Sequence, residues 1–277
     1  MESKNKSFVT INGKECREIS VFDHGLLYGD GVFDTFRVFN KKAFMINEHI
    51  NRLFNSAEMM GIMPQFSKEQ VKEMVKDAYN KSSFDDAFIR IIITCGVGEQ
   101  GIGSLCEPNV IIMVTQREFI PLKQVNAVIS EIRRTNKNSI NPKIKSLNYG
   151  NLVLAAINAK KLGADEAILL SESGKVAEAT TSNVFIVKNG KIITPSIESG
   201  ILEGITRKAV IENFPVTEKS LSPKEIMSAD EVFLTGTANF VTIVKSVNNR
   251  LFNTSAYAEK VFERLMELTK SGEPLFD

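Results

Sequence analysis

Two spacings of hydrophobic residues run along the chain, and they predict different elements. Residues 32–39 alternate with a period of two, which is typical of a strand whose two faces are lined differently, and residues 8–11, followed by Asn12-Gly13, suit a strand and a tight turn. A spacing of three to four follows at about 46–61, where Gly61 ends the pattern, and it predicts a helix. The apolar stripe of this helix consists of Ile46, Ile50, Leu53, Phe54 and Ala57.

A second helix is predicted at about 67–80. Ser67 is its expected N-cap, and Gln70 follows at the spacing of a capping box. Two strongly apolar runs come next, at 88–94 and 110–115, and they predict buried strands. The glycine-rich residues between these runs predict a loop.

The second half of the chain mixes strand and helix patterns without a strict strand–helix–strand alternation. Strands are expected at 125–133, 167–170, 184–188, 191–194 and 232–235, and Asn189-Gly190 is expected to join 184–188 to 191–194 in a hairpin. Helices are expected at about 148–162, from about 205 and at about 254–270. This mixture favours an α/β fold of the mixed α+β kind. The polar segment 117–124 predicts a linker between a small N-terminal α/β domain (1–116) and a larger C-terminal domain (125–277).

Composition excludes several classes of function. The 277 residues carry 34 Lys and Arg against 33 Asp and Glu, a net charge of +1, whereas a nucleic-acid or membrane-surface binder needs a basic excess. The apolar runs are far shorter than the ~20 residues that span a bilayer. The N-terminal residues are polar and contain no apolar signal-peptide core. We therefore expect a cytoplasmic protein that acts on small molecules and binds neither nucleic acid nor membranes.

Cysteine and histidine are scarce, which restricts the available chemistry. Cys16, Cys95 and Cys106 are an odd number and form no CxxC pair, so neither a disulfide framework nor a zinc site is expected. His24 and His49 are the two histidines, and a catalytic triad or a hydrolytic metal site must use one of them. We expect no metal site.

Residues 96–101 match the GxGxxG pattern of dinucleotide-binding folds. That pattern needs a helix directly after it, because the helix N-terminus holds the pyrophosphate. Here the next strand is expected at about residue 109, which leaves no room for a helix. The segment 96–108 is better interpreted as a loop between antiparallel strands, of the kind that often covers a ligand.

Two residues of the second half offer acid–base and covalent chemistry. Lys145 lies after a strand and just before a helix, a position that can direct its amine into a cleft, where it could form a Schiff base with an aldehyde. Glu178 follows an expected hairpin turn at Ser173–Gly174 and could pair with a pyridinium nitrogen. Position alone favours a solvated lysine and a surface glutamate.

Two short segments resemble cradles for an anion. Residues 204–207 open a predicted helix, whose first N–H groups and positive dipole end favour phosphate. Residues 235–238 follow a strand and could supply N–H groups and hydroxyls from a turn. Arg52, on the first helix, could add a forked guanidinium. Taken singly, an ordinary helix start, an ordinary turn and a solvated arginine explain them equally well.

The order of these features resembles one known family, the class IV (fold type IV) pyridoxal-phosphate enzymes. The resemblance covers about residues 8–250. Six segments carry it: Phe22-Asp23-His24-Gly25 with Tyr28-Gly29-Asp30-Gly31-Val32-Phe33, Glu48-His49-Ile50-Asn51-Arg52-Leu53, Lys145-Ser146-Leu147-Asn148-Tyr149, Glu178 with Ser182-Asn183-Val184-Phe185, Gly204-Ile205-Thr206-Arg207, and Asp230-Glu231-Val232-Phe233 with Thr235-Gly236-Thr237-Ala238.

The resemblance implies a cofactor, pyridoxal 5'-phosphate, and a role for each matching residue. Lys145 is implied to hold it as an aldimine and then to move the substrate proton. Glu178 is implied to pair with the pyridine nitrogen, and Tyr149 to bond the ring's phenolic oxygen. The residues implied to hold the phosphate are Arg52, Ile205, Thr206, Gly236 and Thr237, those implied to contact substrate are Phe33, Arg90 and Ala238, and both histidines are implied to be structural.

The family also implies an architecture. Its members have a small N-terminal α/β domain and a large, cofactor-binding C-terminal domain built around a barrel-like sheet, and they are usually homodimers. In this family a partner loop lies over the site, and segment 96–108 is the candidate for it.

The resemblance leaves the reaction open. The motifs at 145–149 and 235–238 resemble the transaminases, and Phe88-Ile89-Arg90 resembles the Tyr-x-Arg strand of branched-chain enzymes, although Phe88 lacks the hydroxyl. Residues 32–37 and 194–202 are more similar to aminodeoxychorismate lyases. We expect an aminotransferase acting on branched-chain-like or D-amino acids and a 2-oxo acid. The alternatives are a 4-amino-4-deoxychorismate lyase, which releases pyruvate, and an inert protein that only binds pyridoxal phosphate.

Overall fold

A seven-stranded and a nine-stranded sheet organise the chain in the computed structural model, which describes residues 6–99, 101–103 and 106–274. The chain divides into two units. Unit 1 holds the described residues up to Glu118, with 144–148 and those from Leu268 onward, and unit 2 holds 119–143 and 149–267. Residues 144–148 and those from 268 onward belong to unit 1 although they follow parts of unit 2 in the sequence, so no single boundary along the chain separates the two units.

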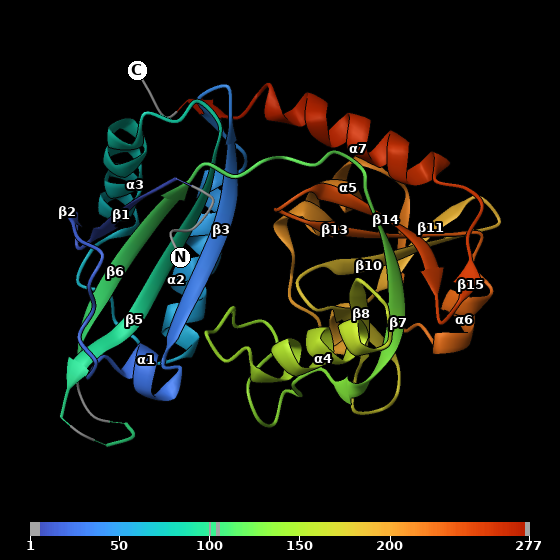
Figure 1. The fold of residues 1–277 in the computed structure, drawn as a ribbon, viewed down its shortest axis with the longest axis horizontal. Coiled ribbons are helices and arrows are strands. Elements are labelled where there is room, and N and C mark those ends of the chain that lie inside the picture. Colours follow the sequence, from blue (N-terminus) through green and yellow to red (C-terminus); the bar gives the residue numbers. More distant parts are fainter. Residues whose placement is uncertain (1–5, 100, 104–105, 275–277) are drawn as a thin grey trace. The chain divides into compact units, whose positions relative to one another are not determined.

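Unit 1 is a sheet with helices on one face. The order of its strands is β16-β4-β3-β5-β6-β1-β2, and α2 and α3 pack side by side against it (Figure 1). The elements are β1 (Ser7–Ile11), β2 (Lys14–Glu15), α1 (His24–Tyr28), β3 (Gly31–Phe39), β4 (Lys42–Ala43), α2 (Ile46–Met59), α3 (Lys68–Ser82), β5 (Ala87–Gly98), β6 (Cys106–Thr115) and β16 (Glu273–Pro274).

The strand β3 has two buried faces. Val32 and Phe36 point into the core shared with α2 and α3. Phe33 and Thr35 alternate with them and point to the opposite face, because successive side chains of a strand alternate. All nine residues of β3 are buried, so the predicted strand is confirmed, and the two differently lined faces both exclude water.

The helices of unit 1 follow their sequence signals where the pattern is long enough. The helix α2 buries most of its predicted stripe, and α3 has the predicted capping box, with Ser67 Oγ and Gln70 each bonding the other's backbone N–H. The helix α1 was not expected, because five residues are too short for a helical period.

The hairpin of β5 and β6 is longer than predicted. The strands extend to Gly98 and begin again at Cys106, so the loop between them is shorter than 96–108. The ladder shifts register between Thr94 and Val97, and Gly96 lies in this bulge with a φ of 88°. No helix follows the GxGxxG pattern within the described residues, which confirms that it is not a dinucleotide fingerprint.

Unit 2 contains a closed ring of strands, which confirms the barrel-like sheet. The ring runs β10-β13-β14-β7-β8-β9, and β9 pairs with β10 to close it. Its strands are β7 (Lys123–Arg133), β8 (Glu166–Leu170), β9 (Val176–Ala179), β10 (Asn183–Lys188), β13 (Glu231–Gly236) and β14 (Phe240–Val247), while β11 (Lys191–Pro195), β12 (Val216–Lys219) and β15 (Arg250–Leu251) lie outside it.

Helices and a short 3₁₀ turn accompany this ring. They are α4 (Gly150–Lys161), η1 (Ile197–Ser199), α5 (Ile205–Asn213), α6 (Pro223–Met227) and α7 (Ala256–Thr269). The predicted hairpin between β10 and β11 is confirmed, with positive φ at Asn189 and Gly190. The sequence pattern missed α6 and the eight-residue strand β14.

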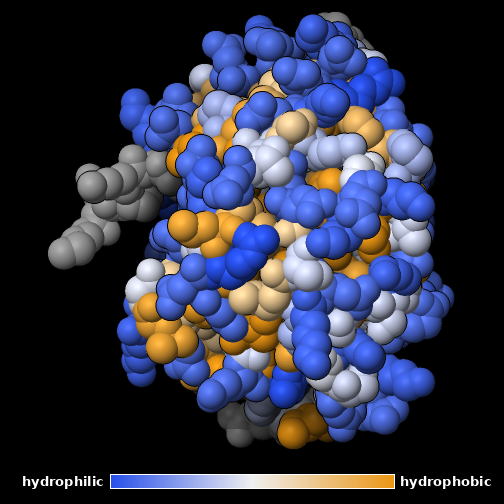
Figure 2. Space-filling model, turned by 90° about the vertical axis from the view of Figure 1, so that its right-hand side faces the viewer, coloured by the Kyte–Doolittle hydropathy of each residue, from blue (hydrophilic) through white to orange (hydrophobic). Residues whose placement is uncertain are grey.

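The lengths and compositions of the helices agree with the short apolar runs of the sequence. Among the described residues, every helix is too short or too polar to cross a bilayer. Figure 2 shows one face of the molecule, where hydrophobic residues lie in small groups among hydrophilic ones.

Candidate active site

Backbone bonds to β3 fix Lys145 in unit 1. Its carbonyl accepts a bond from Phe33 N at 2.9 Å, and Leu147 N donates to Gly31 O at 2.8 Å. Lys145 N donates to Ser56 Oγ on α2 at 3.2 Å. The segment 144–148 therefore behaves as a short extra strand beside β3, and this pairing holds the lysine backbone in one place.

Three of the predicted site residues meet around one aromatic ring. Lys145 Nζ lies 4.7 Å from the centroid of the Phe33 ring, and Arg90 Cζ lies 4.9 Å from the same centroid. Phe33 is buried, Lys145 is half-buried and Arg90 is exposed. A ring flanked by an amine and a guanidinium combines an apolar wall with two cationic groups, which suits a ligand that has an apolar part and an anionic part.

Arg52 has a partner that the sequence did not reveal. Its Nε donates to Asp34 Oδ2 at 2.7 Å and its Nη2 to Asp34 Oδ1 at 2.8 Å, a two-bond fork between α2 and β3. Asp34 is fully buried. Burial opposes its charge, but Arg52 and His49 outweigh burial and hold the pKa of Asp34 well below its ordinary value.

His49 completes this buried group. Its Nδ1–H donates to Asp34 Oδ1 at 2.7 Å. Burial lowers the pKa of His49, although Asp34 acts in the opposite direction, so the imidazole is neutral at neutral pH. Its Nε2 is buried without a hydrogen-bond partner among the described residues.

Glu178 is the corresponding carboxylate of unit 2. It lies on β9, is 6% exposed and accepts bonds from Arg134 Nε, from Asn183 Nδ2 at 3.2 Å and from Leu202 N at 3.0 Å. One positive partner and two neutral donors hold the group as a carboxylate, the form that can accept a bond from a protonated pyridine nitrogen. The sequence pattern did not identify Arg134.

The start of α5 offers backbone donors to a ligand. Its N-cap, Gly204, has no side chain to cap the helix, and the first turn contains no acidic residue. The N–H groups of Ile205 and Thr206 therefore lie at a helix N-terminus that no side chain of the cap satisfies. A Cβ at Gly204 would lie 2.0 Å from Asn183 Oδ1, so only glycine leaves room for Asn183, whose amide nitrogen bonds Glu178.

Gly236 forms the second predicted cradle, at the end of β13. A Cβ there would lie 3.0 Å from Ser182 Oγ, and the neighbouring Thr235 Oγ1 is buried without a partner among the described residues. Thr237 and Ala238 follow in the half-buried turn to β14. This turn has the close backbone approach and the donors of an anion site.

Tyr149 lies at the start of α4. It is the N-cap of this helix, where its carbonyl accepts a bond from Val153 N at 2.9 Å, and its ring packs on the hydrophobic cluster of α4 and β8. These contacts hold the residue in unit 2 and assign it no ligand. Its predicted bond to the cofactor's phenolic oxygen therefore remains a prediction.

The residues present fit pyridoxal phosphate. Unit 1 provides a backbone-anchored amine, and unit 2 provides a buried carboxylate and a helix start whose N–H donors have no side-chain cap. These are the groups that an aldehyde, a pyridine nitrogen and a phosphate require. The residues that sequence reasoning missed, Asp34, Arg134 and Asn183, are partners of predicted residues. Asp34 and Asn183 lay in quoted segments but were given no role, and Arg134 lay in none.

Comparison with known proteins agrees with this chemistry. The model of the family "Amino-transferase class IV" matches residues 31–247. A putative branched-chain-amino-acid aminotransferase of Methanocaldococcus jannaschii is 38% identical, over 97% of this chain and 99% of the relative. The aminodeoxychorismate lyase of Bacillus subtilis is 34% identical, over 82% of each chain.

Solved structures show the same likeness in three dimensions. The branched-chain aminotransferase of Thermoproteus uzoniensis with norvaline has a TM-score of 0.89 and 28% identity, over 96% of each chain. The branched-chain amino acid aminotransferase of Thermobaculum terrenum in its PLP-form has a TM-score of 0.87 and 26% identity, over 97% of this chain and 95% of that one. Because the family match covers well over half of the sequence and agrees with the fold, the chain belongs to the class IV aminotransferase family, whose cofactor is pyridoxal 5'-phosphate.

Proposed function

We propose that the protein is an aminotransferase that moves the amino group of a branched-chain amino acid to a 2-oxo acid. One observation carries this proposal: Lys145 Nζ and Arg90 Cζ both lie within 5 Å of the centre of the buried Phe33 ring, at 4.7 and 4.9 Å. An apolar ring beside a guanidinium suits an aliphatic side chain next to a carboxylate. The names of the relatives and of the solved structures with this fold support the same substrate class.

Each predicted residue then has a stated task. Pyridoxal phosphate supplies the electron-withdrawing ring when it is bound. Lys145 Nζ takes the proton from the Cα of the amino donor, and in the second half of the reaction it gives a proton to the Cα of the former oxo acid. Arg90 orients the substrate carboxylate. Glu178 accepts a bond from the pyridine nitrogen, and Tyr149 donates one to the ring's phenolic oxygen.

The phosphate and the substrate side chain have their own proposed partners. Arg52 would bind the phosphate with N–H groups other than the two that go to Asp34, since a guanidinium has five. The other phosphate partners are the backbone N–H of Ile205 and of Gly236 and the hydroxyls of Thr206 and Thr237. Phe33 and Ala238 would border the substrate side chain.

The first experiment tests the lysine. In Lys145→Ala, borohydride should no longer fix the cofactor to the chain, and transamination should be lost. Lys143→Ala is the matched control, because Lys143 is two residues away, exposed and paired with Glu203 at 2.8 Å. Equal fixation in Lys145→Ala and wild type would show that another amine carries the cofactor.

The second experiment tests the substrate. Wild-type protein is incubated with 2-oxoglutarate and one donor at a time, and glutamate is assayed. L-leucine, L-isoleucine and L-valine should give the highest rates, and D-alanine tests the D-amino-acid alternative. If only D-amino acids gave glutamate, the protein would still be an aminotransferase, but its substrates would be D-amino acids and not branched-chain L-amino acids.

A lyase is the second candidate, because the B. subtilis relative with 34% identity is named for that activity. Both reactions begin with the same lysine and differ in the bond that breaks. Pyruvate release from 4-amino-4-deoxychorismate, with no glutamate from any donor, would favour the lyase.

A homodimer is also proposed. Six apolar residues between positions 19 and 28 are exposed, at and just before α1: Ile19, Val21, Phe22, Leu26, Leu27 and Tyr28. A local apolar surface of this kind is typical of an interface. Light scattering should give a dimer for wild type and a monomer for a Phe22→Asp, Leu26→Asp variant. Met63→Asp, at an exposed site elsewhere in unit 1, should remain dimeric.

A further inference from the structure

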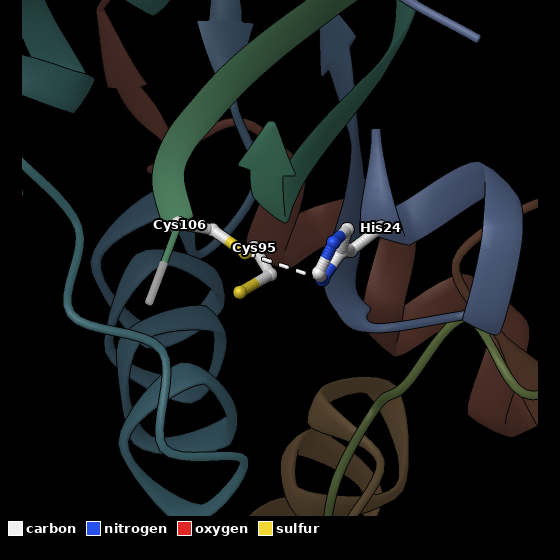
Figure 3. A group of neighbouring side chains, drawn as sticks. All are labelled: His24, Cys95 and Cys106. Carbon is white, nitrogen blue, oxygen red and sulfur yellow. Dashed lines mark hydrogen bonds between the residues drawn. The ribbon is translucent and has the colours of Figure 1, made fainter. Parts of the chain in front are cut away.

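Three residues with metal-binding side chains meet in unit 1, outside the group around Phe33. His24 comes from α1, Cys95 from β5 and Cys106 from β6 (Figure 3). Their ligand atoms all lie within 4.8 Å of one another, and Cys106 Sγ is 3.2 Å from His24 Nδ1. His24 is 2% exposed, and both cysteines are half-buried.

The surrounding polar contacts hold the three residues in place. The carboxylate of Asp23 accepts bonds from Gly25 N at 2.8 Å, from Thr94 Oγ1 at 2.9 Å and from Asn109 Nδ2 at 2.9 Å. Asp23 therefore ties the start of α1 to β5 and β6. It precedes His24 in the chain, and its partner Thr94 precedes Cys95. These bonds fix the backbone that carries the three side chains and do not touch the side chains themselves.

Close backbone approaches add to this rigidity. A Cβ at Gly96 would lie 1.6 Å from Glu107 O, and one at Gly25 would lie 2.5 Å from Thr94 Cγ2. The bulge next to Cys95 and the packing of α1 on β5 thus depend on glycine. The positions of the three ligands are set by the backbone and not by flexible side chains alone.

We propose that His24, Cys95 and Cys106 bind one zinc ion. Zinc–sulfur bonds of ~2.3 Å and zinc–nitrogen bonds of ~2.0–2.1 Å in tetrahedral geometry separate two sulfurs by ~3.8 Å and a sulfur from a nitrogen by ~3.6 Å. In the structure, Cys106 Sγ lies 3.2 Å from His24 Nδ1, and all three ligand atoms lie within 4.8 Å of one another. To reach the separations of a zinc site, these atoms need to move by about 1 Å or less. His24 binds through Nδ1, and a water completes the fourth position, as in other three-ligand zinc sites.

Charge and protons balance in this step. Two thiols each lose a proton to solvent and become thiolates, and their two negative charges neutralise the zinc ion. In the metal-free chain the Cys95 thiol lies within hydrogen-bonding reach of Cys106 and of Asp30. Binding replaces these contacts with bonds to the ion.

Zinc accounts for the cluster better than a disulfide. A disulfide uses the two sulfurs alone and needs an oxidant, and it leaves the imidazole that contacts Cys106 without a role. The ion would also have a structural consequence, because Asp30 O accepts Cys95 N at 2.9 Å and Asp30 N donates to His24 O at 3.2 Å. Zinc would therefore clip the chain just before β3. This role is independent of the proposed substrate.

The test measures zinc binding to the cofactor-loaded, full-length protein with a competing chromophoric chelator. Wild type should bind one zinc per chain, and zinc should raise its unfolding temperature. Cys95→Ser, Cys106→Ser and His24→Asn should each weaken binding at least about tenfold. Cys16→Ser is the matched control, because Cys16 is a half-buried cysteine of unit 1 outside the cluster, and its affinity should equal that of wild type.

Cobalt provides a second readout that does not depend on activity. Wild type and Cys16→Ser with cobalt should show a thiolate-to-metal charge-transfer band that Cys95→Ser and Cys106→Ser lose. Failure of wild type to bind zinc stoichiometrically would overturn the proposal. So would equal affinity in the Cys16→Ser and Cys106→Ser variants, or reductant-reversible loss of two thiols in metal-free buffer together with no cobalt band. If a serine variant does not fold, the wild-type cobalt spectrum and His24→Asn still decide the matter.

Discussion

Each unit contains an arginine paired with a buried carboxylate. In one pair the arginine is the proposed cofactor contact, and in the other pair the carboxylate is. In unit 1, Arg52 is the proposed cofactor contact and Asp34 holds it. In unit 2, Glu178 is the proposed contact and Arg134 holds it. Asp34 and Glu178 are 0% and 6% exposed. Asp34 and Arg134 have no proposed contact with a ligand, and each orients the partner that does.

The two pairs differ in geometry. Arg52 forms a fork with two bonds to Asp34, which also accepts His49 Nδ1–H and Thr35 N. Arg134 reaches Glu178 through Nε, and the other bonds to Glu178 described above come from neutral donors. The two carboxylates therefore differ in their partners: Asp34 is bonded by an arginine fork, a histidine and a backbone N–H, whereas the bonds described for Glu178 come from a single arginine nitrogen and two neutral donors.

The largest expected effect is on Asp34. Asp34→Ala leaves Arg52 and His49 without their buried anion and should lower the free energy of unfolding by about 3–5 kcal/mol. The urea midpoint measures it. Glu73→Ala breaks an exposed pair with Lys76 and should change the midpoint little. Equal effects of the two variants would show that Asp34 is not a structural anchor.

The second prediction tests whether Arg134 positions Glu178 for the reaction or only stabilises unit 2. Arg134→Met removes the positively charged donor described for Glu178 and should cost about 1–3 kcal/mol of stability. It should also lower kcat more than it raises KM, because Glu178 is the proposed partner of the pyridine nitrogen. Arg133→Met, at the exposed neighbouring position, is the control. A stability loss with unchanged kcat would make Arg134 a purely structural residue.

The third effect depends on pH. The pKa of His49 is lowered in the folded protein, so the unfolded chain binds more protons just below the ordinary pKa, and stability falls as pH decreases through about 6.5. Wild type should lose up to about 1.4 kcal/mol per pH unit more than His49→Gln in this range. Urea midpoints at two pH values, one above and one below this pKa, measure it. Parallel losses in the two proteins would contradict a neutral His49.

The smallest effect concerns the fork itself. Arg52→Lys replaces two directed bonds by one point charge and should destabilise unit 1 by about 1 kcal/mol. Arg134→Lys, which replaces a single Nε bond, should cost less. The reverse order would mean that the fork on Asp34 adds nothing beyond its charge.

Much of the fold could be predicted from local patterns. Both long helices of unit 1 follow their predicted period, the hairpin follows its Asn189-Gly190 turn, and the strands β5 and β6 contain the apolar runs 88–94 and 110–115. The missed elements are short or lack a period: α1 and α6 have five residues each, and β14 carries buried residues on both sides of the strand. The length of the β5–β6 hairpin was underestimated, because glycines at its bulge are typical of a loop.

The candidate site divides in the same way. Lys145, Glu178 and the start of α5 were identified from the order of motifs, which is a property of the sequence. Their roles as cofactor contacts remain predictions. The partners Asp34 and Arg134 could not be identified, because 18 residues separate Asp34 from Arg52 and 44 separate Arg134 from Glu178, and no local spacing relates the members of either pair.

The elements with a clear period, the lack of a basic excess and the ordered motifs of the family are all visible in the linear sequence. Which side chains meet depends on the three-dimensional fold. His24 and Cys106 are 82 residues apart, and no local spacing relates them. Local periodicity records which face of an element is buried, whereas strand order, register and a glycine-dependent bulge decide which buried groups become neighbours.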